Sequence, residues 1–534
     1  MTRRAGVLLH PSSLPGHSGI GELGPMARAF LDWLASSGHR VWQVLPLNPV
    51  DRHGCPYAAA SATAGEPLLL SLDDLVRDGW LKQSERPYAS AHDRVDYPTV
   101  RQRKGPALAL AADRVRAQLD VRGLASPSQR TWALYRALQD RHGPGWPQWP
   151  EALRHRDADA LGAAEDEHAE AIERELALQW LFDQQWLALR ATADHIGIEL
   201  WGDVPFFVGL WSADVWAQPE LWRLDDQFRP TVQSGVPPDA FSATGQLWGH
   251  PLYDEAAHVD QEHAWWMDRI GRALQLHHRV RIDHFRGFAG VWEVAADAED
   301  AIGGAWIDGP GRPLLERMVA KWPDLPLLAE DLGVITPDVR ELRDGFDLPG
   351  MAILQFAFER PDHEYLPHNH RKNQVVFTGT HDNDTLMGWV HSSAEVVRDR
   401  ARRYLASSDR DLPWYMCRAA WLSVADTAIV PMQDLLSLAL RKPDYRAASA
   451  IIVAGLLRCP PISELPVDQI EAVIVGAIGA DQSSHLRVRS PGCLFGPQHA
   501  CQCHVADVFT QCSTLFCRGR IDTCGSDFWR KTAS

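Results

Sequence analysis

The stretch Arg281-Ile282-Asp283-His284-Phe285 decides the fold class, because it ends an apolar run in a carboxylate. The runs Ala329-Glu330-Asp331-Leu332-Gly333 and Phe377-Thr378-Gly379-Thr380-His381-Asp382-Asn383 have the same form further along the chain. In a barrel of parallel strands the side chains at the carboxyl ends converge on one face, so acids far apart in sequence meet in space. The three stretches therefore predict carboxylates gathered at one end of a parallel barrel.

Eight apolar, β-branched runs can be placed as strands of such a barrel. Several are joined by amphipathic stretches, such as 25–37 and 311–322, as a βα repeat requires. The sequence thus predicts an α/β protein with a TIM (β/α)8 barrel. The predicted strands are 5–10, 39–46, 197–206, 278–285, 325–333, 350–358, 374–382 and 427–434.

Two gaps between the predicted strands are too long for simple crossovers. The gap from about 70 to 190 is rich in Ala, Arg, Leu and Glu, and a segment such as 163–193 indicates a helical insertion. A second insertion, at about 208–270, is heavy in Trp, Pro and Gly over 208–254, where we expect loops. Both insertions are expected to rise over the carboxyl-end face. The catalytic domain is predicted to span residues 1–440.

Composition limits the partners. The chain has 534 residues, is 45% hydrophobic and carries a formal net charge of -16, so nucleic acid or an anionic membrane would repel it. A neutral substrate is compatible. The start of the chain has no secretory signal pattern, because His10-Pro11 ends a short apolar run, and no stretch is long enough to span a bilayer. We expect a cytoplasmic enzyme, and the sequence leaves its oligomeric state unknown.

Converging carboxylates suit chemistry at a glycosidic bond. A retaining glycosidase needs one carboxylate to attack the anomeric carbon and a second, protonated one to assist the leaving oxygen, about 5 to 5.5 Å apart. Arg281 lies two residues before Asp283, on the same side of the strand, and is expected to lower its pKa. Glu330 ends an apolar strand, where desolvation holds a proton. Asp331 alternates to the opposite side.

Each candidate also has a structural alternative. Asp283 with Arg281 fits an ion pair at a strand end, and Glu330 fits a cap of the following turn. Asp382 and His381 fit a polar turn, or metal ligation together with Asp384. We predict no metal and no cofactor, since glycosyl transfer needs neither.

Several ordered motifs resemble those of glycoside hydrolase family 77, the 4-alpha-glucanotransferases, also called amylomaltases or disproportionating enzymes. The resemblance covers roughly residues 5 to 438. Besides the three acidic stretches, it rests on 10–15 (HPSSLP), 42–47 (WQVLPL), 202–208 (GDVPFFV), 212–216 (SADVW), 235–242 (GVPPDAFS) and 245–249 (GQLWG).

The resemblance implies roles for the predicted site residues. Asp283 is the expected nucleophile and Glu330 the acid/base, while Asp382 is expected to stabilise the oxocarbenium-like transition state and His381 to hydrogen-bond the same sugar ring. Asp384 is expected to be structural, and maltodextrins are the expected partners. Other sugar contacts are expected from Arg281, Tyr57, Trp248 near the acceptor subsites, and Asp239. The chain departs from the family at Glu66, where Asn is usual.

Beyond residue 440 the chain changes character. Residues 441–534 hold 10 Lys/Arg and 8 Asp/Glu, against 43 and 61 before them, and contain seven of the nine cysteines. The family ends in an Asn-Trp-Arg-Trp-like segment, which nothing here resembles. We interpret the tail as a frameshift, a mis-joined gene model or a damaged copy, with a divergent domain as the alternative. Its cysteines lack paired zinc knuckles, although Cys501, Cys503 and His504 offer part of one.

Three function classes stay open. The first is a retaining α-glucanotransferase, the second an α-glucan hydrolase on the same barrel, and the third an inactive or merely glucan-binding product of a disrupted gene. The segment 236–252 resembles the transferase loop and favours the first class. The third class depends entirely on the tail.

Overall fold

The computed structural model describes residues 3–436 except 17, 51–53, 88–93 and 239–241. The chain divides into two compact units, Met1–Glu464 and Leu465–Ser534, and all described residues belong to the first. The predicted tail, 441–534, and the predicted ligand Asp239 lie outside the described residues.

Eight parallel strands form the barrel, which confirms the predicted TIM fold. They follow the order β10-β11-β12-β1-β2-β3-β6-β9, and the amide of Ala329 donates to the carbonyl of Pro349 at 3.0 Å, which joins the two ends of the sheet. The strands are β1 (Arg4–Leu8), β2 (Val41–Gln43), β3 (Glu199–Pro205), β6 (Arg279–Asp283), β9 (Leu327–Ala329), β10 (Gly350–Ile353), β11 (Gln374–Phe377) and β12 (Thr427–Pro431).

The barrel interior is filled by apolar side chains from most of these strands. Strands β10, β11 and β12 are buried at every position, as expected for parallel strands covered on both faces. Gly6 of β1 permits a close approach, since a Cβ there would lie 2.7 Å from Val41 Cβ. The central side chains are Leu8, Val41, Leu45, Trp201, Leu328, Met351, Ile353, Val375, Phe377 and Ile429.

All eight predicted strands exist, but most are shorter than predicted: β9 ends at Ala329 and β11 at Phe377, where the sequence predicts ends at 333 and 382. Two of the predicted strands also run on into helices. Residues 354–358 and 432–434 were included in strands, whereas they fall in or directly beside the short helices α15 (Leu354–Ala357) and α19 (Met432–Leu435). A buried strand that continues into a buried helical turn is one uninterrupted apolar run, so periodicity cannot locate the boundary.

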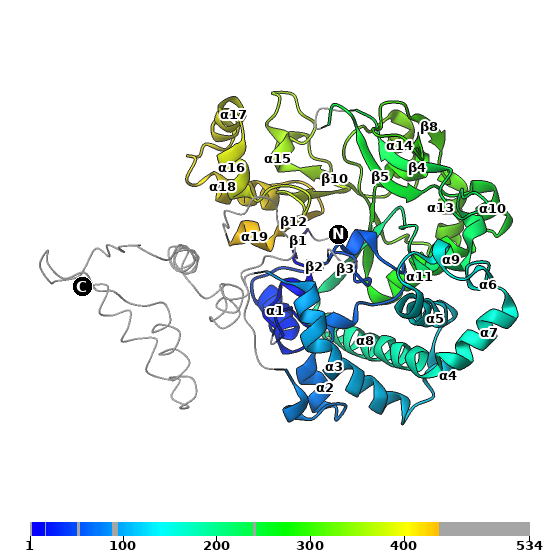
Figure 1. Cartoon of the computed structure of the whole chain (residues 1–534). Helices are drawn as coiled ribbons and strands as arrows, with labels where there is room; N and C mark the ends of the chain where they lie inside the picture. The colour runs from blue at the N-terminus through cyan, green and yellow to red at the C-terminus, as the bar shows by residue number, and fades with distance from the viewer. Residues whose placement is uncertain (1–2, 17, 51–53, 88–93, 239–241, 437–534) are drawn as a thin grey trace, which may run out of the picture. The chain divides into compact units, whose positions relative to one another are not determined.

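Helices cover the outside of the barrel (Figure 1). The helix α1 (Pro25–Ser36) follows β1 and buries Phe30, Leu31 and Leu34. The later helices are α10 (Glu255–Asp260), α11 (Ala264–Leu276), α12 (Arg286–Ala289), α13 (Gly311–Lys321), α14 (Pro337–Gly345), α16 (Leu386–Ser392), α17 (Glu395–Leu405) and α18 (Leu412–Leu422).

The first insertion is helical, as predicted. Its longest helix, α8, contacts α3 and α5 and ends at Gly197, whose φ of 73° is the left-handed conformation that glycine adopts at helix ends. The buried Lys104 of α3 donates to Glu22 at 2.7 Å and ties the insertion to the barrel. The helices are α2 (Leu72–Arg77), α3 (Tyr97–Arg116), α4 (Val121–Leu124), α5 (Pro127–His142), α6 (Glu151–Arg154), α7 (Ala158–Glu167) and α8 (Ala169–Ile196).

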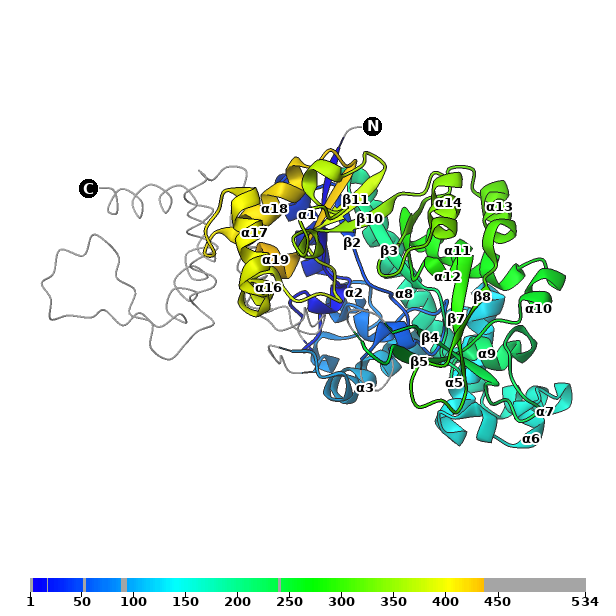
Figure 2. The same ribbon diagram turned by 90° about the horizontal axis from the view of Figure 1, so that it is seen from above.

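The second insertion differs from the predicted loop. It contains α9 (Ala213–Ala217) and two strands, β4 (Val232–Val236) and β5 (Gln246–Pro251). These join β7 (Gly290–Ala295) and β8 (Ala305–Asp308) in an antiparallel sheet of order β5-β4-β7-β8. The partner strand β7 lies more than fifty residues further on, so no local pattern indicates the pairing. In Figure 1 and in Figure 2 this sheet lies apart from α16, α17 and α18.

No helix in the described part of the chain is long and apolar enough to cross a membrane.

Candidate active site

A buried ion network joins β3 and β6 at their carboxyl ends. The register pairs Asp203 with Arg281 and Pro205 with Asp283. Arg281 donates to Asp203 Oδ2 at 2.7 Å and to Asp283 Oδ1 at 2.8 Å. The side chains of Arg281 and Asp203 are 3% and 1% exposed, against 28% for Asp283. One guanidinium therefore fixes both carboxylates, and the outer one faces the barrel mouth.

Tyr57 extends this network across the barrel mouth. Its hydroxyl donates to Asp203 Oδ2 at 2.6 Å. Its ring stacks on His381, with centroids 4.9 Å apart and an angle of 4° between the planes. The segments after β2 and β11 are thus joined, and Tyr57, Arg281, Asp283 and His381 lie together as the sequence predicts.

The sequence assigned no role to Asp203, although it accepts from both Tyr57 and Arg281. The same signal marks it, because it is an acid near the end of an apolar predicted strand, 197–206. Asp203 Oδ1 is buried without a hydrogen-bond partner among the described residues, so the carboxylate interacts through its other oxygen alone.

Glu330 follows β9 directly and is held by two backbone amides. The amide of His284 donates to Oε2 at 2.6 Å and that of Leu332 to Oε1 at 3.0 Å. The pairing of Ile282 with Ala329 makes Asp283 and Glu330 the next residues on two neighbouring strands. His284 has a φ of 56°, an unusual conformation for a residue with a side chain, and it directs its amide at Glu330.

The environment separates the protonation states of these two acids. Burial raises the pKa of Asp283 to about 6, with Arg281 opposing and the charges of Asp203 and Asp382 adding to it. Burial raises the pKa of Glu330 to about 8, with Arg281 and the two amides opposing and Asp283 adding to it. The expected net lowering of the Asp283 pKa is therefore wrong, because desolvation outweighs the guanidinium. At neutral pH Asp283 is still mostly ionised and Glu330 mostly protonated.

Asp331 points away from this pair, as its alternation predicts. Its Oδ1 accepts from the amide of Met351 at 2.7 Å and its Oδ2 accepts from Arg343. Asp384 also makes local bonds, since its carboxylate accepts from the amide of Thr385 at 2.8 Å.

Asp382 stands on the loop after β11 with its side chain 68% exposed. His381 Nε2 lies 3.3 Å from Asp382 Oδ1. The charge of Asp382 raises the pKa of both Asp283 and Tyr57, which places Asp382 on the same mouth of the barrel.

Trp248 of β5, in the antiparallel sheet, contacts the residue that follows Asp283. Its ring meets His284 edge to face at 4.7 Å and Phe207 at 6.1 Å. The second insertion therefore brings an aromatic face beside the residue that follows Asp283.

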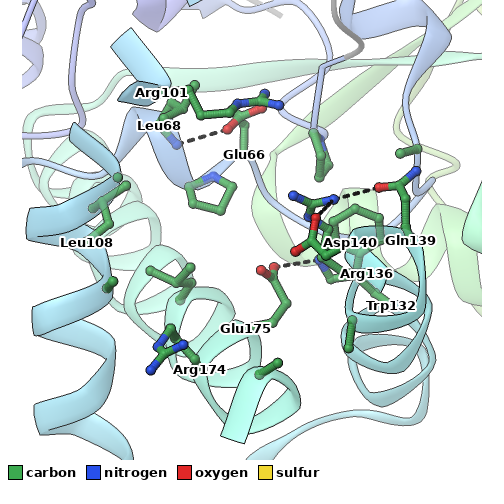
Figure 3. A pocket seen from close by; sticks show the side chains of 18 of the residues that line it. Glu66, Leu68, Arg101, Leu108, Trp132, Arg136, Gln139, Asp140, Arg174 and Glu175 are labelled. Atoms are coloured by element: carbon green, nitrogen blue, oxygen red, sulfur yellow. Dashed lines mark hydrogen bonds and ion pairs between the residues drawn. The ribbon is translucent and has the colours of Figure 1, made fainter. Parts of the chain in front are cut away.

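A cavity of about 320 Å³ lies away from these acids, among α3, α5 and α8 (Figure 3). Glu66 lines it and accepts from the amides of Val50 and Leu68, both at 2.9 Å. Glu175 lines it too and accepts from Trp132 Nε1 at 2.6 Å. Glu66, which stands where the family usually has Asn, therefore has a local structural role, because it holds the backbone at Val50 on the N-terminal side of Tyr57.

Within the described residues, no group of three or more His, Cys, Asp or Glu is arranged to hold a metal ion. The tail residues Cys501, Cys503 and His504 lie outside that part of the chain.

A (β/α)8 barrel with an aspartate and a glutamate at the carboxyl ends of neighbouring strands is an arrangement typical of enzymes that act on glycosidic bonds. The model of glycoside hydrolase family 77, described as 4-alpha-glucanotransferase, matches residues 9–444. The chain belongs to this family, whose activity is the transfer of α-1,4-glucan segments from one chain to another.

Comparisons with individual proteins give the same family. The chain is 46% identical over 451 residues to the chloroplastic/amyloplastic 4-alpha-glucanotransferase of Arabidopsis thaliana, covering 82% of this chain and 78% of the relative. It is 42% identical over 466 residues to the 4-alpha-glucanotransferase of Thermus thermophilus, covering 82% and 91%. The structure of the Streptococcus agalactiae amylomaltase in complex with acarbose matches with a TM-score of 0.80 and 30% identity, over 89% of this chain and 98% of that one.

Proposed function

We propose that Asp283 is the nucleophile and Glu330 the acid/base of a retaining transfer between maltodextrins. One observation carries the proposal. Asp283 and Glu330 lie at the ends of adjacent strands, the first bonded to the guanidinium of Arg281 and the second to two backbone amides. Burial raises the pKa of Glu330 to about 8 and that of Asp283 only to about 6, which favours Glu330 as the group that carries the proton.

In the first step, Glu330 gives its proton to the glycosidic oxygen of the donor as that oxygen leaves the anomeric carbon. Asp283 attacks the same carbon and forms a covalent β-glucosyl ester. Arg281 holds Oδ1 of Asp283, which leaves Oδ2 for the sugar.

In the second step, the 4-hydroxyl of an acceptor glucan gives its proton to Glu330. The acceptor oxygen then attacks the anomeric carbon and the ester to Asp283 breaks, so two inversions give net retention. Asp382 carries a negative charge near the positive charge that develops on the sugar ring, and His381, stacked on Tyr57, presents a hydrogen-bonding edge to the same ring.

The remaining binding roles are also proposals. Trp248 offers an aromatic face to an acceptor glucose, because apolar sugar faces stack on aromatic rings. Asp239 is proposed as a sugar ligand on the strength of its motif alone. The Streptococcus agalactiae amylomaltase, which is similar to this chain, is in complex with acarbose, and this supports an oligosaccharide ligand.

The products of maltotriose test the choice between transfer and hydrolysis. A transferase gives glucose and a ladder of longer maltodextrins, while the concentration of reducing ends stays nearly constant. A steady rise in reducing ends without longer products would make the chain a hydrolase, and no change at all would support an inactive product.

We also propose that residues 1–440 are the catalytic unit and that the tail is an artefact of the reading frame. The end of the family match, at residue 444, supports this division. Resequencing the gene around codon 440 tests it, since a one-base correction should restore an Asn-Trp-Arg-Trp-like ending. An intact frame with a protease-resistant tail would make 441–534 a real domain. A cytoplasmic location stays a prediction, since the Arabidopsis relative is named chloroplastic/amyloplastic.

A further inference from the structure

The loop 378–386 carries both His381 and Asp382, and its tip is shaped by its own residues. Asn383 Oδ1 accepts from the amide of Thr380 at 2.8 Å, and Thr380 Oγ1 accepts from the amide of Asp382 at 3.2 Å. These bonds set the conformation of residues 380–383. The position of these residues over the barrel mouth depends on how the two ends of the loop are held.

Asp434 holds both ends from one side. Its Oδ2 accepts from Thr378 Oγ1 at 2.7 Å, and its Oδ1 accepts from the amide of Leu386 at 2.7 Å. Asp434 lies in α19, directly after β12, and is 3% exposed. A single carboxylate thus spans the two points where the loop leaves β11 and enters α16.

Gln355 holds the loop from the other side. Its backbone amide donates to the carbonyl of Thr378 at 3.2 Å, and its side-chain Nε2 donates to the carbonyl of Asp384 at 2.6 Å. The contact is close, because a Cβ on Gly379 would lie 2.7 Å from Gln355 Nε2. Gln355 follows β10 and Asp434 follows β12, which are the two neighbours of β11 in the barrel.

Burying the charged carboxylate of Asp434 costs free energy of folding. Burial raises its pKa to about 7, with the bonds from Thr378 and Leu386 opposing. No basic side chain among the described residues contributes to the pKa of Asp434. A buried carboxylate without a cation lowers stability unless its hydrogen bonds compensate, and both of its strong bonds go to the loop.

We propose that Asp434 and Gln355 are positioning residues, which fix the height and orientation of His381 and Asp382 over the reacting sugar without touching it. The proposal rests on the sugar-ring role proposed above for His381 and Asp382. It assigns a function in the transfer reaction to α19, the helical turn directly after β12.

The test compares Asp434→Ala, Asp434→Asn and Gln355→Ala with a matched control, Ser423→Ala. Ser423 is also 3% exposed, and its Oγ makes two bonds, to His370 Nδ1 at 2.8 Å and from the amide of Ala425 at 3.1 Å. Ser423 precedes β12, whereas the loop follows β11, so the two lie at opposite ends of these parallel strands. Each variant is measured for kcat and KM with maltotriose and for melting temperature.

Displacing the loop weakens contacts made in the transition state, so Asp434→Ala and Gln355→Ala should each lower kcat about 10- to 100-fold and change KM less than about threefold. Asp434→Asn can still accept from Leu386 and donate to the hydroxyl of Thr378, so it should keep kcat within about fivefold of the wild type. Ser423→Ala should lower the melting temperature and leave kcat unchanged.

Two results would overturn the proposal. One is a kcat for Asp434→Ala and Gln355→Ala equal to that of Ser423→Ala, which would make both residues merely structural. The other is a loss in Asp434→Asn as large as in Asp434→Ala, which would show that the charge acts and the bonds do not. If Asp434→Ala fails to fold, Thr378→Val removes one of its two bonds at nearly constant shape and should lower kcat in the same way; an unchanged kcat there would count against the proposal.

The variant Asp382→Ala, measured in parallel, distinguishes the positioning role of Asp434 and Gln355 from the sugar-ring role of Asp382 on which it rests. If Asp382→Ala keeps full activity, the sugar-ring role of the loop is wrong. If Asp382→Ala is impaired and the Asp434 and Gln355 variants are not, the positioning proposal alone fails.

Discussion

Asp283, the last residue of β6, and Glu330, directly after β9, are held differently from Asp382, which lies on the loop after β11. Asp283 and Glu330 lie in contacts that the protein itself completes, with a guanidinium on one and two amides on the other. Asp382 stands 68% exposed on a loop whose ends, rather than whose carboxylate, are fixed. On the proposed roles, the difference means that the nucleophile and the acid/base are held by the protein before substrate binds, whereas the surroundings of Asp382 become complete only when a sugar ring occupies the barrel mouth.

The largest effect is expected from Asp283→Asn. It keeps the shape of the side chain and removes the nucleophile, so kcat should fall by at least about 10⁴-fold, while maltodextrin binding, measured by calorimetry, stays largely intact. A variant near the wild-type rate would remove Asp283 from this role and leave the preset pair without its base.

Glu330→Gln should come next, with a loss of kcat of about 10³-fold for maltotriose. A donor with a fluoride leaving group needs no protonation, so α-maltosyl fluoride should restore formation of the glucosyl-enzyme in this variant. Equal impairment with both donors would mean that Glu330 does not act as an acid.

The pH profile should show the two preset pKa values. Activity rises as pH increases through about 6, where Asp283 loses its proton, and falls above about 8, where Glu330 loses its own. The bell shape of kcat/KM against pH checks this. In Glu330→Gln the alkaline limb should vanish and the acidic limb should remain; an alkaline limb that survives would belong to another group.

Asp382→Asn should have a smaller effect, a loss of about 10²-fold in kcat, because only a charge contact to the ring is removed. Its loss should be the same with maltotriose and with α-maltosyl fluoride, since no proton transfer depends on it. If α-maltosyl fluoride restored the kcat of this variant, Asp382 would instead take part in protonating the leaving oxygen.

The sequence predicts the region around Asp283 and Glu330 better than the loop that carries Asp382. Asp283, Glu330 and Arg281 follow from strands that end in charge, because the barrel itself brings such ends together. The sign of the Asp283 pKa shift does not follow, since it depends on how much water the completed site excludes. Asp203 had the same strand-end signal and was passed over because its partners, Tyr57 and Arg281, lie far from it in sequence.

The second insertion shows the other limit of sequence reasoning. Trp248 was expected on a loop and lies on β5, in a sheet completed by strands from 290–308. The contacts of Asp434 and Gln355 cannot be predicted locally either, because both residues fall within the predicted strands 350–358 and 427–434, whereas the structure has them in the short helices α15 and α19.

The smallest effect concerns stability. Glu330 has a folded-state pKa of about 8, above its ordinary 4.5, so its contribution to folding is full at low pH and is lost as pH rises through that range. Glu330→Gln should therefore raise the melting temperature by at least about 2 °C above pH 8 and give no gain near pH 4. Asp382→Asn, changing an exposed group, should give no such gain; a gain of the same size there would remove the contrast between the two regions.

The most direct test of the preset pair is to trap the covalent intermediate. The full chain is mixed with a fluorinated maltosyl donor whose ring deactivates the second step, then digested and analysed by mass spectrometry. The account predicts one added glycosyl group, located on Asp283, which forms in the wild type and is missing in Asp283→Asn. An adduct on another carboxylate, or rapid transfer to acceptor in the Asp283→Asn variant, would contradict it.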